Sequence, residues 1–291
     1  MLEKIPARLH VVMAREANKA VIVRRGPSRW VRLILWHTDT DEFEGGQWLR
    51  GRIYGERCDL SPDGSLFLYF ATQHHKYAGG YRGTWTAISK PPYLTALALW
   101  PVGSTWCGGG IFIDNRTICL HHCGPAEAHP NHQPPKGLRI ISDFSELTTK
   151  RDRKTLERLK ARRWQMVHQP ANERDLHAFG RRVDDPPGYH LAHPTEDRYY
   201  LVMRDYGYIP DYYPSPPIWE FALGDGGNNT EIVLEGANWA GWDQRGRLAY
   251  VRDGQVFAHE PSLIGTFARP LADFNDQTFE EIPTPAWASR W

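Results

Sequence analysis

The fold of this chain is decided by the stretch Cys58-Asp59-Leu60-Ser61-Pro62-Asp63-Gly64-Ser65-Leu66-Phe67-Leu68-Tyr69. An apolar run that begins at Leu66 follows the turn residues Ser61 to Gly64 directly. Proline fixes φ, and glycine accepts the positive φ that a tight turn requires. The stretch therefore predicts a strand, a turn and a second strand that pairs with the first as a hairpin.

Similar hairpin patterns recur along the chain, each with apolar segments on both sides of a polar turn. The turns are centred near Asn18, Gly64, Asn115, Asp197 and Gly246. Their spacing is roughly 50 residues, with one longer interval between Asn115 and Asp197. This period is typical of a β-propeller blade, in which four antiparallel strands form one repeat.

Each interval has room for two further strands, such as Leu94 to Trp100 in the second repeat and Trp164 to His168 in the third. The longer interval holds an insertion over about residues 123–163, in which Ser145 caps an expected helix. The prediction is an all-β, five-bladed β-propeller of four-stranded antiparallel blades, with a helical insertion in the third blade. One domain is expected over residues 1–291. A β-sandwich or two smaller β-domains are the alternatives.

Two turns carry a resemblance to known proteins. The Ser61-Pro62-Asp63-Gly64 turn and the Asp243-Gln244-Arg245-Gly246 turn resemble those of TolB-type and WD40-like β-propellers. The Gly-His and Trp-Asp signatures of WD40 repeats are absent. The resemblance is one of repeat style, so it implies a propeller and no particular activity.

Composition and charge restrict the class of protein. Aromatic residues make up 12% of the chain, and 26 glycines and 22 prolines indicate many turns, which favours β-structure. The net charge of +1 gives no overall field for nucleic acid or membranes. Four cysteines in so long a chain do not indicate a disulfide framework. With no signal-peptide or membrane-helix pattern, a reducing cytoplasm is the expected compartment.

The first strand of each propeller blade lines the central channel, so ligands are expected at the channel mouth. The ligand-binding candidates there are His10, Arg57, Asp59, Asp114, His190 and Asp243. Side chains alternate along a strand, so about half of them face inward. In the other interpretation, the three aspartates bond nearby backbone amides and support the blade turns.

A second group is a possible zinc site. Cys119, His121 and Cys123 share one face if their segment is a strand, and zinc binds such nitrogen and sulfur donors. Their spacing matches no finger or ribbon pattern. Cys119 is equally well explained as a small buried apolar residue. Apart from this possible zinc ion, no cofactor is expected.

The insertion is strongly basic. Arg153, Arg158, Arg162 and Arg163 are the candidates for binding an acidic partner. A solvated helix face explains the same charges. The nearly neutral chain does not favour nucleic acid, because specific binders carry a broader basic footprint.

These patterns favour a non-catalytic interaction module that binds a protein or small ligand through its loops and channel mouth. The alternative is a glycan-acting hydrolase, which needs two carboxylates near the mouth. Asp59 and Asp114 are the best pair for that chemistry. No GxGxxG, Walker or GxSxG motif occurs in the structural context that it requires.

Overall fold

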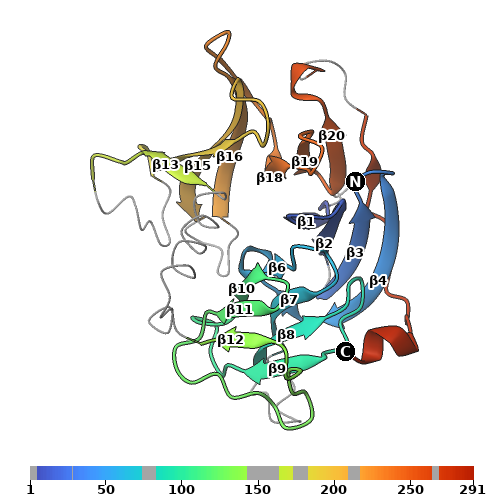
Figure 1. Cartoon of the computed structure of the whole chain (residues 1–291). Coiled ribbons are helices and arrows are strands. Elements are labelled where there is room, and N and C mark those ends of the chain that lie inside the picture. Colours follow the sequence, from blue (N-terminus) through green and yellow to red (C-terminus); the bar gives the residue numbers. More distant parts are fainter. Residues whose placement is uncertain are drawn as a thin grey trace. The chain divides into compact units, whose positions relative to one another are not determined.

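The computed structural model describes residues 5–27, 29–73, 83–142, 164–172, 183–208, 217–263 and 269–291. It is an all-β structure with several antiparallel sheets (Figure 1). The chain divides into two compact units. Unit 1 contains Met1–Leu156 with Asp276–Trp291, and unit 2 contains Glu157–Asn275.

Unit 1 holds three sheets in chain order. The first sheet is β1 (Arg8–Met13), β2 (Lys19–Arg25), β3 (Trp30–His37) and β4 (Glu42–Arg50). The second is β5 (Arg52–Ile53), β6 (Asp59–Leu60), β7 (Phe67–Thr72), β8 (Thr84–Ser89) and β9 (Ala98–Pro101). The third is β10 (Gly110–Asp114), β11 (Thr117–Leu120) and β12 (Arg139–Ile141). Each sheet is thus built from consecutive strands.

Unit 2 holds two further sheets. The fourth sheet is β13 (Gln165–His168), β14 (Gly188–Ala192), β15 (Tyr199–Tyr208), β16 (Pro217–Asp225) and β17 (Thr230–Val233). The fifth is β18 (Ala237–Trp242), β19 (Leu248–Arg252), β20 (Gln255–His259) and β21 (Ala272–Asp273). The described helical segments are the short turns η1 (Gly55–Arg57), η4 (Pro261–Leu263) and η5 (Ala286–Ser289). None of them is long and apolar enough to span a membrane.

All five predicted hairpin turns are confirmed. The antiparallel pairs β1–β2, β6–β7, β10–β11, β14–β15 and β18–β19 enclose them in order. Gly64 and Gly246 have φ of 70° and 80°, the left-handed values for which glycine is preferred. The Asp63 carboxylate accepts hydrogen bonds from the hydroxyl groups of Ser61 (2.6 Å) and Ser65 (2.8 Å), which fixes the turn.

Within the described residues, the predicted number of four antiparallel strands is found in the first and fifth sheets. The segment predicted as the fourth strand of the third repeat is β13, which pairs with β14 and joins the fourth sheet. The third sheet ends instead at β12, which runs parallel to β11. The second sheet gains β8, which the sequence analysis missed. The helical part of the predicted insertion and its four arginines lie outside the described residues.

The second sheet buries both of its faces. Phe67, Tyr69 and Ala71 of β7 face the first sheet and share a core with its valines and leucines. Leu68, which lies between the first two of these along the strand, packs with Phe112 and the apolar residues of the third sheet. This alternation follows from the period of two along a strand. The three sheets of unit 1 are therefore stacked face to face in chain order.

Unit 2 has an equivalent core between its two sheets. Leu201 and Phe221 of the fourth sheet pack with Leu248, Tyr250 and other apolar residues of the fifth sheet. The rings of Tyr250 and Phe257 are stacked, with centroids 4.8 Å apart.

The C-terminal segment of unit 1, Asp276–Trp291, packs on the first two sheets without forming a strand. The Gln47 side chain donates to the carbonyl oxygen of Ile282 at 2.9 Å. The Lys90 ammonium donates to the carbonyl oxygen of Trp287, also at 2.9 Å. Because Gln47 belongs to the first sheet and Lys90 follows β8 of the second, this segment connects the two sheets.

Candidate functional site

The first strands of the three hairpins in unit 1 lie close together, with β6 in contact with both β1 and β10. Asp59 of β6 is buried, and its Oδ2 accepts a hydrogen bond from the backbone N–H of Phe112 in β10 at 2.7 Å. The same oxygen accepts from Arg15 Nη1 at 3.3 Å, and Arg15 Nη2 donates to the Phe112 carbonyl oxygen at 2.7 Å. Asp59 therefore connects the second and third sheets.

The two other candidate aspartates bond their own hairpin turns. The exposed Asp114 accepts from the Arg116 backbone N–H at 2.7 Å. The buried Asp243 accepts from the backbone N–H of Arg245 at 2.9 Å and of Arg247 at 2.8 Å. These contacts match the turn-supporting interpretation. The glycan-hydrolase alternative stays a prediction, because these contacts do not test it.

The two candidate histidines lie in different units. In unit 1, His10 of β1 lies against Gly55, where a Cβ would collide with the imidazole ring. In unit 2, the ring of His190 lies 4.5 Å from that of Tyr200. Burial and the nearby Arg204 lower the pKa of His190, while Glu231 raises it. The six predicted ligand-binding residues are therefore divided: four belong to unit 1, and His190 and Asp243 belong to unit 2.

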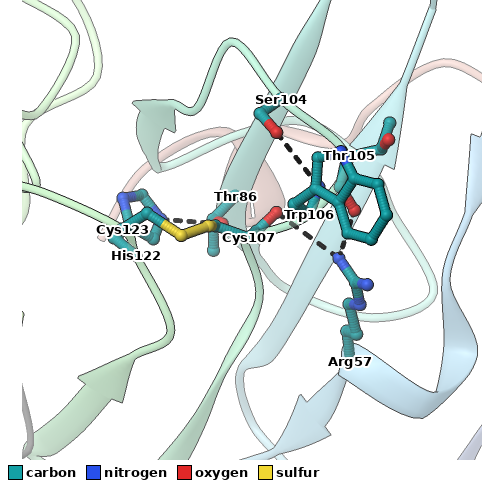
Figure 2. The surroundings of a disulfide bond; sticks show 8 residues. All are labelled: Arg57, Thr86, Ser104, Thr105, Trp106, Cys107, His122 and Cys123. Carbon is teal, nitrogen blue, oxygen red and sulfur yellow. Dashed lines mark hydrogen bonds between the residues drawn. A yellow bond between two sulfur atoms is a disulfide. The ribbon is translucent and has the colours of Figure 1, made fainter.

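The cysteines of the predicted zinc site have different roles. Cys123 forms a disulfide with Cys107, with the two Cα atoms 5.8 Å apart (Figure 2). Cys119 is a buried thiol in β11. A zinc site that uses Cys123 would first require this disulfide to be reduced, since zinc binds the thiolate. Across the described ranges, no cluster of three or more histidine, cysteine or carboxylate side chains suits a metal ion.

The chain has one disulfide, although its four cysteines did not indicate a disulfide framework. It anchors residues 102–109, the connection between β9 and β10, to the segment that follows β11. We refer to residues 102–109 as the Trp106 loop. Disulfides are typical of oxidising compartments. The cytoplasmic location stays a prediction.

The Trp106 loop is fixed at several further points. Arg57 Nη1 donates to the carbonyl oxygens of Thr105 (2.8 Å) and Cys107 (3.4 Å) (Figure 2). The backbone of Gly108 and Gly109 pairs with that of His121 through hydrogen bonds of 2.6 and 2.9 Å. Between these anchors, the side chain of Trp106 is 76% exposed. The loop therefore presents a largely exposed aromatic ring on a backbone that is held at several points.

Gly108 is required for this conformation. Its φ is 112°, a value that other residues rarely adopt, and a Cβ there would collide with the Phe70 ring. The backbone of Gly108 therefore lies directly on the Phe70 ring, next to Cys107 and its disulfide.

A neutral histidine supports the base of the loop. His122 Nε2 lies 3.0 Å from Thr86 Oγ1, which also accepts from the Gly109 backbone N–H at 2.8 Å. Burial, with a smaller contribution from His121, lowers the pKa of His122 to about 4. The unprotonated nitrogen of a neutral imidazole can accept a hydrogen bond, so the Thr86 hydroxyl can donate to His122 while it accepts from Gly109.

Replacing both Cys107 and Cys123 by serine is expected to lower the free energy of unfolding by about 3 kcal/mol, because the disulfide closes a loop of 16 residues. Urea unfolding monitored by circular dichroism measures this loss. Ser104→Ala is the control, since it removes only a hydrogen bond to the Trp106 backbone N–H in the same loop. A double-serine variant as stable as Ser104→Ala would contradict the anchoring role.

Sequence reasoning selected Arg57 but missed its neighbours. The guanidinium groups of Arg52 and Arg57 lie 4.3 and 5.3 Å from the centroid of the Tyr54 ring. Arg8 and Arg25 are opposite each other on β1 and β2. The sequence feature that could have indicated this group is an arginine at the end of each of several strands. Which of these arginines lie together depends on the register of the strands, which the sequence alone does not show.

No protein-family model and no curated protein matches the sequence. The β-propeller domain of the Trilobed protease from Pyrococcus furiosus, described as having an open velcro topology, is similar at 8% identity, over 91% of this chain and 71% of that chain, with a TM-score of 0.29. An uncharacterised protein from Listeria monocytogenes EGD-e is similar at 6% identity, over 92% of this chain and 54% of that chain, with a TM-score of 0.24. This chain thus spans just over half the length of the Listeria protein.

Proposed function

We propose that this chain is a five-bladed, β-propeller-type binding module that holds a protein or small ligand through loops at one end of its sheets. The propeller proposal is supported by the five hairpins in series and by the stacking of three consecutive sheets in unit 1. The contacts of β6 with β1 and β10 agree with it, since first strands lie innermost in a propeller.

The binding proposal depends mainly on one observation, the exposure of Trp106 on a loop whose backbone is held by a disulfide and by Arg57. Burying such a ring removes a large apolar surface from water. Tryptophan is accordingly enriched among the residues that dominate binding energy. A backbone that is already fixed loses little conformational freedom when a partner binds. The favoured occupant is therefore a protein partner that covers the ring.

Trp106→Ala is expected to weaken this binding strongly. Immobilised wild-type protein, Trp106→Ala and Trp287→Ala would be incubated in parallel with an extract of the cells that make the protein, and the retained proteins quantified. Trp287 is the matched control because it is also exposed in unit 1, at 55%. We expect a partner retained by the wild type and Trp287→Ala, and reduced at least about tenfold by Trp106→Ala.

The result that would overturn the proposal is equal retention by Trp106→Ala and the wild type. Circular dichroism of each variant before immobilisation checks that the fold is intact. Because Trp106 is exposed, its replacement is expected to leave stability nearly unchanged.

A further inference from the structure

Four arginines gather at one end of the first and second sheets of unit 1. Arg8 begins β1 and Arg25 ends β2, and the two are direct partners in the antiparallel pairing. Arg52 begins β5, and Arg57 is the last residue of η1. We refer to Arg8, Arg25, Arg52 and Arg57 as the arginine cluster. Its members come from four separate elements, so the fold itself assembles it.

Tyr54 orients one side of the cluster. Its ring contacts the guanidinium groups of Arg52 and Arg57 and also the Phe70 ring, whose centroid is 5.1 Å away. A guanidinium over an aromatic face is attracted by the ring but still has N–H groups that can donate elsewhere. Arg57 uses Nη1 to hold the Trp106 loop. Within the part of the chain that the structure describes, the Arg52 guanidinium contacts the face of the Tyr54 ring, a contact that leaves its N–H groups able to donate to a ligand.

The charges of the cluster are poorly balanced. The ion pairs within the described part of the chain do not include Arg8, Arg25 or Arg52. Like charges directly opposite each other on paired strands are destabilising. Burial lowers the pKa of Arg25. The nearby charges of Arg52 and Arg8 lower the pKa of Arg25 further, whereas Tyr54 and Glu56 raise it. The group nevertheless stays charged near neutral pH, because an arginine titrates far above it.

We infer that Arg8, Arg25 and Arg52 bind a phosphate group, either free or as the monoester of a small molecule. Guanidinium groups match phosphate oxygens in pairs of parallel hydrogen bonds, and a dianion balances clustered positive charge. A polyanion is a poorer match, because the whole chain carries a net charge of only +1. These arginines form the phosphate site without any contribution from a partner bound at Trp106. The inference is therefore independent of the proposed function and goes beyond it.

The test is calorimetric titration of the full chain with inorganic phosphate and, separately, with glycerol 3-phosphate. The salt is kept below about 0.1 M to limit screening, and the pH is above neutral so that the phosphate is a dianion. The variants are Arg25→Gln and Arg52→Gln. Arg116→Gln is the control, because it removes one exposed positive charge from the β10–β11 turn of the same unit.

We expect saturable binding by the wild type and Arg116→Gln, weakened about tenfold or more by Arg25→Gln and by Arg52→Gln. The preferred titrant distinguishes free phosphate from an ester. Binding of neither titrant, or equal binding by all four proteins, would overturn the inference. Trp106→Ala should bind phosphate normally, so failure of the proposed function remains distinguishable from failure of this site.

Thermal unfolding provides a second readout that a folding defect would not imitate. Removing a repelled charge in Arg25→Gln should leave the Tm in chloride unchanged or raise it. Millimolar phosphate should raise the Tm of the wild type and Arg116→Gln by binding the folded state, but not that of Arg25→Gln. Equal increases in all three proteins would indicate a general salt effect and refute the site.

Discussion

Replacement of Asp243 by alanine is expected to lower the free energy of unfolding by about 3–5 kcal/mol. The Asp243 carboxylate is buried in unit 2, and its Oδ2 accepts from Arg247 Nε at 2.8 Å. Its other oxygen accepts from the backbone N–H of Arg245 and Arg247. The substitution leaves the largely buried Arg247 guanidinium without this carboxylate, and it removes two hydrogen bonds from the turn.

Urea unfolding followed by far-ultraviolet circular dichroism measures this effect. Glu220→Ala is the matched control, because Glu220 also pairs with an arginine of unit 2, Arg204, at 2.9 Å, but both side chains are about one-third exposed. Exposed pairs contribute about 1 kcal/mol or less. If the two variants lose the same stability, burial does not determine the strength of the Asp243 pair.

The hairpins could be predicted because their signals are local. Within a few residues, the segment around Gly64 contains proline, an aspartate whose side chain bonds the turn, and a glycine at positive φ. The turn at Asp243 to Gly246 repeats this logic with a carboxylate that accepts two backbone amides. Such chemistry fixes where the chain reverses, whatever surrounds it.

Strand partners and sheet size were less predictable, because they depend on contacts between distant segments. A short segment such as Gln165–His168 does not indicate which neighbouring strand it will pair with, and it joined the sheet that follows it. The fully buried Thr84–Ser89 strand contains two threonines and a serine, and its alternation was not recognised as that of a core strand.

The features of the candidate site are likewise of two kinds: some follow from local sequence, and others depend on contacts between distant segments. The turn-supporting role of Asp114 and Asp243 follows from local spacing, and the alternative interpretation of these residues anticipated it. The Cys107–Cys123 disulfide joins two segments that meet only in the folded chain, beside the contact of Gly108 with Phe70, and no spacing reveals it. The arginine cluster likewise requires the register that places Arg8 opposite Arg25.

Asp59→Ala is expected to lower the free energy of unfolding by about 3 kcal/mol. The substitution leaves the buried N–H of Phe112 without its carboxylate acceptor, which costs about 1–3 kcal/mol. It also removes the partly buried ion pair with Arg15, whose side chain is 21% exposed. The loss should be accompanied by faster amide exchange in β10, because Asp59 and Arg15 both hold the backbone of Phe112.

Asp114→Ala is the control for this variant. Asp114 is exposed and accepts one hydrogen bond from its own turn, so its loss is expected to cost about 1 kcal/mol or less. Urea unfolding of both variants gives the two free energies, and hydrogen exchange of the amides in β10 locates the effect. If Asp59→Ala unfolds like the wild type, the carboxylate does not hold the two sheets together. The burial of Asp59 beside Arg15 would then need a different explanation. The glycan-hydrolase alternative offers one, because it uses Asp59 as one of its two carboxylates.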